Sequence, residues 1–214
     1  MSVIQSSKTW LDERGPLSHP GRRMSEEEFD RWVEEKTRAE WVNGEVIMMA
    51  PANLEHDDVA WWLRSVVTHF VEFHDLGKVH GAEVMIRVPA LNQKRLPDVL
   101  FVTKKRAGIL KKTIVDGPPD LIMEVVSPDS VERDWVEKLE DYERAGVKEY
   151  WIVDVPAKKM EAYLLKTGKY RKVMEKEGKI SSGVLKGFYL RPQWVIGGKL
   201  PRMMQVVREL GVDE

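Results

Sequence analysis

The sequence predicts one α/β domain with a mixed β-sheet, and two patterns support this prediction. Residues 120–127 (DLIMEVVS) form an apolar strand pattern, a helix pattern follows at about 131–145, and residues 149–156 (EYWIVDVP) are again strand-like. Such a strand–helix–strand order with apolar strands favours a βαβ unit containing two parallel strands. The turn signal Asn43-Gly44 predicts an antiparallel hairpin. A chain of 214 residues is long enough for one domain with its own core.

The other elements follow from caps and periodicity. Ser25 and Glu28 match the capping-box pattern, which predicts a helix that runs to about residue 38. Apolar residues keep helical spacing from Glu55 to about Asp75, and Gly77 is the predicted stop. Further strands are predicted at 83–90 (EVMIRVPA), 95–104 (RLPDVLFVTK), 160–166 (MEAYLLK) and 169–175 (KYRKVME).

We expect the chain to have three parts. Residues 1–22 are polar and contain prolines, so they are predicted to form an arm. This arm is either a disordered lead-in or a segment that docks on a partner subunit through Trp10 and Leu11. The folded domain is expected at residues 23–200, and residues 201–214 are expected to form a tail.

The composition excludes several classes of protein. The chain has no cysteine, which excludes disulfides and thiolate metal sites and leaves Asp, Glu and His as possible metal ligands. With a formal net charge of −1, the protein would need local basic patches to hold a polyanion. No apolar run approaches the roughly 20 residues of a membrane helix, and the N-terminus lacks the apolar segment of a signal peptide. We therefore expect a cytoplasmic protein without membrane contact.

Three charged side chains interrupt segments whose pattern predicts burial. Glu124 lies within the apolar strand at 120–127, and Asp98 interrupts the apolar run at 96–102. At about 100° per residue, Lys138 falls in a helical sector of roughly 80° with Val131, Trp135, Tyr142 and Ala145, whereas Glu132, Arg133, Glu137, Glu140 and Arg144 point elsewhere. Because an unpaired buried charge is costly, these three side chains are expected to meet.

Two interpretations of this set are open. In the first, Lys138 reaches from the edge of the apolar stripe to form a structural ion pair with Glu124, and Asp98 is a turn residue after Pro97. In the second, two carboxylates on neighbouring strands form a site for a hard cation, because oxygen ligands suit Mg²⁺ or Mn²⁺.

These residues also carry a resemblance to a known family. Pro97-Asp98, followed by Glu124 on the next strand, resembles the PD-(D/E)XK nuclease superfamily. A longer stretch of this sequence resembles the "putative restriction endonuclease" family within that superfamily. The matching residues are Pro119, Asp120, Glu124, Ser127, Pro128, Lys138, Tyr142, Gly146, Val147, Tyr150, Trp151 and Asp154. Upstream, Glu40, Gly44, Glu45 and His56 match too, so the resemblance spans about residues 24–175. Val126 stands where the superfamily has its lysine, and in this family a lysine on the following helix, here Lys138, takes that place.

The resemblance implies a restriction-endonuclease-like mixed β-sheet flanked by helices and metal-dependent hydrolysis of DNA. It implies that Asp98, Glu124 and the Val125 carbonyl bind Mg²⁺ or Mn²⁺, and that Lys138 orients water or stabilises charge on the phosphate. Glu40 either contributes a carboxylate to a second metal or to the lysine, or lies at the surface of the hairpin edge. The alternative function is a non-catalytic nucleic-acid-binding or assembly protein on the same fold.

Four other polar residues are expected outside the catalytic set. Glu45 is expected at the surface, and Asp120 is expected to have a turn or cap role. Asp154 ends a strand and is expected to cap the loop at Pro156. His56 begins a helix, where a cap or surface position is expected.

Nucleic-acid contact is predicted at residues 104–112 (KKRAGILKK), directly after the strand of Asp98. Its five basic residues, Lys104, Lys105, Arg106, Lys111 and Lys112, suit phosphate contacts, although an ordinary solvated loop has the same composition. Trp61 and Trp62 occupy adjacent helix positions and cannot face the same core. One of them is therefore expected in a subunit interface or against another element of the fold, and the pair favours a homodimer.

Overall fold

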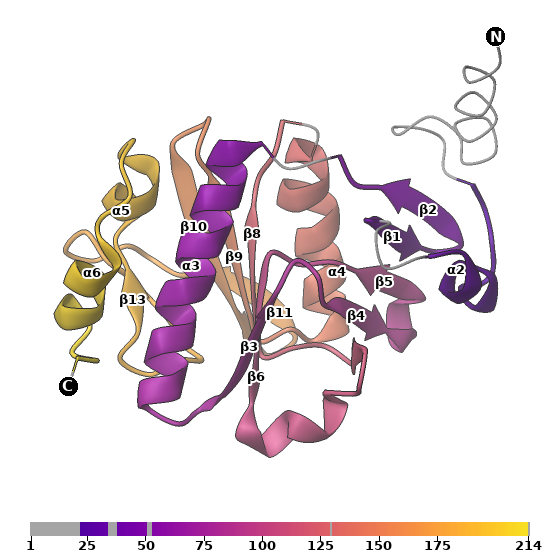
Figure 1. Cartoon of the computed structure of the whole chain (residues 1–214), viewed down its shortest axis with the longest axis horizontal. Helices are drawn as coiled ribbons and strands as arrows, with labels where there is room; N and C mark the ends of the chain where they lie inside the picture. Colours follow the sequence, from indigo (N-terminus) through magenta and orange to yellow (C-terminus); the bar gives the residue numbers. More distant parts are fainter. Residues whose placement is uncertain (1–21, 34–37, 51–52, 129, 214) are drawn as a thin grey trace, which may run out of the picture.

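The computed structural model describes residues 22–33, 38–50, 53–128 and 130–213. Two sheets form most of the fold, and helices lie on both faces of the larger one (Figure 1). Nearly all of the predicted arm, with Trp10 and Leu11, lies outside the described residues. No helix in the described ranges is long and apolar enough to cross a membrane.

The larger sheet has six strands in the order β11-β10-β9-β8-β6-β3. Its strands are β3 (Gly77–Gly81), β6 (Val99–Thr103), β8 (Leu121–Val125), β9 (Glu149–Asp154), β10 (Lys159–Lys166) and β11 (Lys169–Lys172). β8 and β9 are parallel, as the strand–helix–strand pattern predicts, and the other neighbours are antiparallel. Every residue of β8 and β9 is buried, so these strands are covered on both faces.

The smaller sheet has the order β2-β1-β5-β4-β7. Its strands are β1 (Ala39–Val42), β2 (Glu45–Met48), β4 (Met85–Val88), β5 (Gln93–Arg95) and β7 (Ile114–Asp116). The Asn43-Gly44 hairpin is confirmed, because both residues have the positive φ, 52° and 88°, that a two-residue type I′ turn requires. The single strand predicted at 95–104 is wrong. The chain leaves the smaller sheet after Arg95 and enters the larger one at Val99, so Asp98 lies where it crosses between sheets.

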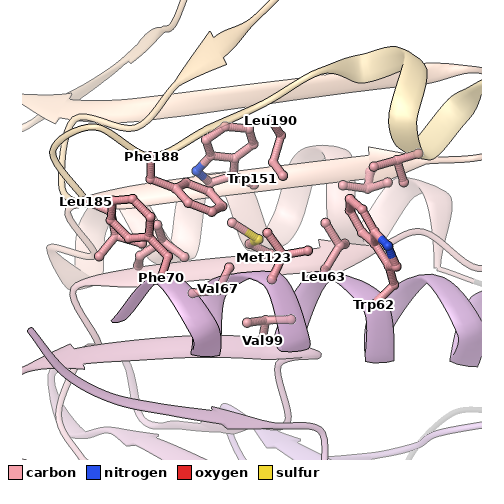
Figure 2. Packing of buried hydrophobic residues seen from close by; sticks show 14 of the residues in the cluster. Trp62, Leu63, Val67, Phe70, Val99, Met123, Trp151, Leu185, Phe188 and Leu190 are labelled. Atoms are coloured by element: carbon pink, nitrogen blue, oxygen red, sulfur yellow. The ribbon is translucent and has the colours of Figure 1, made fainter. Parts of the chain in front are cut away.

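Helices α3 (Leu54–Phe73) and α4 (Lys138–Ala145) pack on opposite faces of the larger sheet (Figure 1). Strand alternation separates the two cores: Val99 and Met123 belong to the α3 core, while Leu100 and Ile122 belong to the α4 core. Figure 2 shows Trp62, Leu63, Val67 and Phe70 of α3 beside Val99, Met123 and Trp151.

Two helix ends differ from the prediction. The capping box of Ser25 is confirmed, but its helix α2 (Glu26–Trp32) ends before the predicted residue 38. α3 ends at Phe73, and Gly77 belongs to β3 instead of stopping the helix. A Cβ atom at Gly77 would lie 2.1 Å from the carbonyl oxygen of Val102. Glycine at this position therefore allows β3 to approach β6.

The expected tail contains helix α6 (Met203–Glu209), whose residues Val206 and Val207 are buried in the α3 core. The indole N–H of Trp62 donates to the Pro201 carbonyl oxygen at 3.0 Å. Short elements precede α6: β12 (Ile180–Ser181), β13 (Tyr189–Leu190) and α5 (Pro192–Ile196). The end of the described chain is thus part of the packed fold.

Candidate active site

The three charges that interrupt the apolar pattern come together. Lys138 Nζ lies 3.0 Å from Glu124 Oε1, and these side chains are only 2% and 3% exposed. The Tyr142 hydroxyl donates to the same Glu124 oxygen at 2.9 Å. Asp98 is 7% exposed and points into the fold. The expected contact of Lys138 with Glu124 is confirmed, and Asp98 is close enough for its charge to raise the pKa of Glu124.

The strand register places the two carboxylates. Val99 of β6 pairs with Met123 of β8, so Asp98, one residue earlier on the antiparallel neighbour, comes beside Glu124. The Val125 N–H then donates to Asp98 Oδ2 at 2.8 Å. A backbone donor on β8 therefore orients a side chain that stands just outside β6.

The environment of Glu124 is rich in acids. Burial raises the pKa of Glu124, whereas the positive charge of Lys138 lowers it. The negative charges of Asp98, Asp134 and Glu40 raise it further, and the pKa of Glu124 reaches about 8. Burial lowers the pKa of Lys138, yet the surrounding carboxylates outweigh burial and raise it above its ordinary value. Lys138 therefore stays protonated, and its single charge does not neutralise the acids around it.

Asp134 completes the surroundings of Lys138 and was missed by the sequence reasoning. Its Oδ1 lies 2.9 Å from Lys138 Nζ as an ion pair, although this contact is not aligned as a hydrogen bond. The Ser130 hydroxyl donates to Asp134 Oδ2, and the Tyr150 hydroxyl donates to the Asp134 backbone carbonyl at 3.0 Å. The i, i+4 spacing of Asp134 and Lys138 was the available signal.

The chain enters α4 through a π turn at Arg133–Glu137, in which the Lys138 N–H bonds to the Arg133 carbonyl. Because the turn contains one extra residue, the side chains that precede it are rotated about the helix axis by about 100° relative to their positions in a continuous α-helix. The prediction that Val131 faces inward is therefore wrong, and this side chain is 47% exposed. Arg133, which was expected on the solvated face, is half-buried.

A second ion cluster adjoins the first and centres on Arg95. Arg95 Nη1 donates to Glu40 Oε2 at 2.9 Å, and Nη2 donates to Asp141 Oδ2 at 2.7 Å. The Leu96 N–H donates to Glu40 Oε1 at 3.1 Å, and this oxygen is also 3.9 Å from Lys138 Nζ. Glu40 thus connects the two clusters.

Glu40 is fully buried, so the surface alternative for this residue is wrong. Burial acts to raise its pKa, but Lys138 and Arg95 outweigh burial and lower it to about 2. Glu40 therefore stays a charged carboxylate between Arg95 and Lys138. Its partner Arg95, and Asp141 as the second acid on that arginine, carried no signal in the sequence, because Arg95 lies on a three-residue strand and Asp141 on the predominantly polar helix α4.

His56 belongs to the site, and its predicted cap or surface role is wrong. Asn53 caps α3 instead, by accepting from the His56 backbone N–H at 2.8 Å. His56 Nε2 lies 3.4 Å from Asp98 Oδ2. Burial lowers the pKa of His56, but Asp98 and the Val125 carbonyl outweigh burial and raise it.

The other polar residues lie outside the cluster. Asp120 accepts from the Thr103 N–H at 2.9 Å and pairs with Lys148 at 2.6 Å, so it fixes the opposite end of β6 and β8. Asp154 accepts from the Ala157 N–H at 2.9 Å, which confirms its role as a loop cap. Glu45 is half-buried on β2.

The basic segment at 104–112 is not brought to the carboxylates. It begins after the end of β6 that is far from Asp98, and the extended strand between them spans about 20 Å. In Figure 1 the segment lies at the bottom of the view. Lys104 pairs with Asp75, and Arg106 lies 3.1 Å from Asp120. Lys105, Lys111 and Lys112 are exposed. Phosphate contact by this segment stays a prediction, and such contact would be remote from the acids.

The donor set suits a hard divalent cation. Within the described ranges, contacts to Asp98 use Oδ2 and contacts to Glu124 use Oε1, so each carboxylate keeps one oxygen without a protein donor. The described residues include no group of three or more acidic or histidine side chains arranged to hold a metal alone. Mg²⁺ needs no such group, because it commonly takes one or two carboxylates and keeps several waters.

Comparisons with known proteins agree with this fold. A crystal structure from Anabaena variabilis ATCC 29413, described as a "putative nuclease belonging to DUF820", superimposes with a TM-score of 0.70 at 14% identity and covers 81% of this chain and 98% of that one. This likeness shows the restriction-endonuclease-like fold. No curated protein matches the chain. Residues 26–192 match the Uma2 family, whose description is "Putative restriction endonuclease". The match covers most of the sequence, and the chain therefore belongs to the Uma2 family.

Proposed function

We propose that this protein is a metal-dependent endonuclease that hydrolyses phosphodiester bonds of DNA. The observation that carries the proposal is the incomplete neutralisation of the buried acids around Lys138. Glu124, Asp134 and Glu40 share one lysine, and Asp98 and Glu124 each keep a carboxylate oxygen free of protein donors in the described ranges. A buried excess of negative charge is costly unless a cation joins it.

Asp98, Glu124 and the Val125 carbonyl are the proposed ligands of Mg²⁺ or Mn²⁺. When bound, the cation supplies a Lewis acid for a phosphate oxygen and lowers the pKa of a coordinated water. The Val125 N–H holds Asp98 in place, and the Tyr142 hydroxyl holds Glu124. Both carboxylates are therefore oriented before any ligand arrives.

Lys138 is the proposed donor to the attacking water or to the phosphate oxygens. Its raised pKa keeps the ammonium charged at neutral pH. Asp134 at 2.9 Å and Glu40 at 3.9 Å fix its position. A preorganised cation of this kind stabilises negative charge that develops on the phosphate. Asp134 and Glu40 act through Lys138 and are positioning residues.

The alternative is a nucleic-acid-binding or assembly protein without catalysis on the same fold. It has no need for oriented carboxylates with free oxygens, so the arrangement around Asp98 favours the enzyme. A purely structural ion network predicts that Mn²⁺ leaves the melting temperature unchanged. The proposed metal site predicts a higher melting temperature with Mn²⁺, because the cation binds only the folded state.

We also propose a homodimer. Trp62 is buried, whereas the adjacent Trp61 is 56% exposed on α3, as expected for a residue that contacts another subunit. Leu54, seven residues earlier and on the same side of α3, is exposed too. Sedimentation equilibrium should show a dimer that Trp61→Ala weakens. A monomer throughout the micromolar range would contradict this proposal.

Cleavage of plasmid and linear duplex DNA by the purified protein tests the main proposal. We expect Mg²⁺-dependent cutting, and Asp98→Asn should reduce it by on the order of a thousandfold, at the upper end of the loss when a charge-stabilising group is removed. Asp213→Asn, at an exposed carboxylate that follows α6, is the matched control and should cut normally. Full activity of Asp98→Asn would reject the proposed role of Asp98.

A further inference from the structure

Two arginines at the ion cluster have no acidic ion-pair partner among the described residues. Arg38 and Arg133 are half-buried, and the Nε of each is enclosed without a hydrogen-bond partner among the described residues. By contrast, Arg87 and Arg95 each pair with two carboxylates. Buried donors without a partner are rare in folded proteins and cost about 1–3 kcal/mol each. Arg38 and Arg133 thus offer donors that the described protein does not use.

The π turn brings Arg133 to the site. Residues five apart stand about 140° apart on a continuous α-helix, whereas an i→i+5 turn places them on the same side. The turn from Arg133 to Lys138 is of this second kind. The charge of Arg133 also contributes to the lowered pKa of Glu40, which agrees with this position. π turns of this kind often occur at functional sites.

Arg38 approaches from the smaller sheet. It lies one residue before β1, and its carbonyl accepts from the Met49 N–H at 2.9 Å, which continues the ladder between β1 and β2. Side chains two residues apart on a strand share a face. Arg38 therefore lies on the same face of the hairpin as Glu40, whose carboxylate contacts Arg95 and Lys138.

We propose that Arg38 and Arg133 form an arginine pair that binds phosphate groups of the DNA beside the proposed metal centre. This inference rests on the proposed function. Among the described residues, the five carboxylates of Glu40, Asp98, Glu124, Asp134 and Asp141 have three permanently charged ion-pair partners, Lys138, Arg95 and the exposed Arg144. Such a site repels a polyanion unless cations stand at its edge. Guanidinium groups suit this task because their planar fork donates to phosphate through two parallel bonds.

DNA binding as a function of salt tests the pair. Arg133→Gln and Arg38→Gln are made in the Asp98→Asn background, so that binding of a fluorescent duplex is measured without cleavage. Each substitution should lower the slope of log affinity against log salt by about one, because one phosphate contact is lost. Arg133→Lys should keep the slope and weaken binding, because it keeps the charge and loses the fork. Arg208→Gln, on the exposed side of α6, is the control and should change neither.

Two results would overturn the proposal. An unchanged slope in both glutamine variants would show that neither arginine contacts phosphate. A lower melting temperature with an unchanged slope would assign the arginines a structural role. The proposed function fails separately, if the wild-type protein with Mg²⁺ leaves DNA uncut. In that case a reduced slope would still identify the pair as a nucleic-acid contact.

Discussion

The two halves of the buried ion cluster differ in how completely their charges are satisfied. In the Arg95 half, the guanidinium donates to Glu40 and Asp141, and Gln93 adds a further donor to Asp141 at 2.8 Å. In the Lys138 half, one ammonium group serves several carboxylates, and Glu124 has a strongly raised pKa. Both halves are buried and they share Glu40. Burial of charge by itself is therefore a poor guide to function, and the proposed metal site rests on the incomplete neutralisation of the Lys138 half.

The halves should respond differently to mutation, and the largest effect on stability is expected at Arg95. Arg95→Met removes the nearest cation from Glu40 and Asp141, so the free energy of unfolding should fall by about 3–5 kcal/mol. Urea denaturation at pH 7 measures this change. The triple variant with Glu40→Gln and Asp141→Asn should regain part of the loss. A loss below about 1 kcal/mol would show that the Arg95 half is not a structural ion cluster.

Acid should destabilise the protein through Glu40, which joins the halves. Its pKa of about 2 in the folded state lies below the ordinary 4.5, so its contribution is complete above pH 4.5 and is lost as the pH falls toward 2. A shift of this size corresponds to about 3 kcal/mol. Glu40→Gln should be less stable than wild type at pH 7, and the difference should shrink at pH 3. Parallel stability curves for the two proteins would contradict this expectation.

Glu124 should show the opposite pH dependence. Its pKa of about 8 in the folded state lies above 4.5, so its stabilising contribution is complete below pH 4.5 and is lost as the pH rises through 8. Without metal, Glu124→Gln should therefore be more stable than wild type at pH 8.5 by about 2 kcal/mol, because loss of the charge-assisted bond from Lys138 offsets part of the gain. Thermal melts at pH 5 and pH 8.5 test this. A variant that is less stable at pH 8.5 would show that Lys138 already neutralises Glu124.

The smallest effect is expected from the basic segment at 104–112. Lys105→Ala with Lys112→Ala should lower the salt slope of DNA binding by about one or two if this segment contacts phosphates. The cleavage rate at saturating DNA should stay unchanged, because the segment is far from the acids. Fluorescence anisotropy and cleavage assays separate the two quantities. An unchanged slope would remove the segment from the DNA-contacting surface.

Local patterns predicted the parts of the fold that depend on local chemistry. The hairpin turn at Asn43-Gly44 follows from the positive φ of both residues, and the parallel pair follows from two apolar strands around a helix. The inward face of Lys138 was also predicted correctly, because the helix C-terminal to the π turn is regular.

The rest of the site depends on features that periodicity does not contain. The π turn moves the side chains of Val131 and Arg133 to other sides of the helix, because it adds a residue to one turn. A helical wheel assumes a constant 100° per residue and cannot show this. Arg95 joins Glu40 and Asp141 across 55 and 46 residues, and such pairings carry no local signal. The position of His56 at a helix start favours a cap, but Asn53 fills that role.

Calorimetric titration with Mn²⁺ tests the central claim most directly, because it requires neither DNA nor activity. Wild type should bind about one Mn²⁺ and release protons at pH 7, since the raised pKa of Glu124 means that a proton must leave before the carboxylate can bind metal. Glu124→Gln, which keeps the shape of the side chain, should neither bind Mn²⁺ nor release protons. Equal binding by the two proteins would contradict the assignment of these acids as a metal centre.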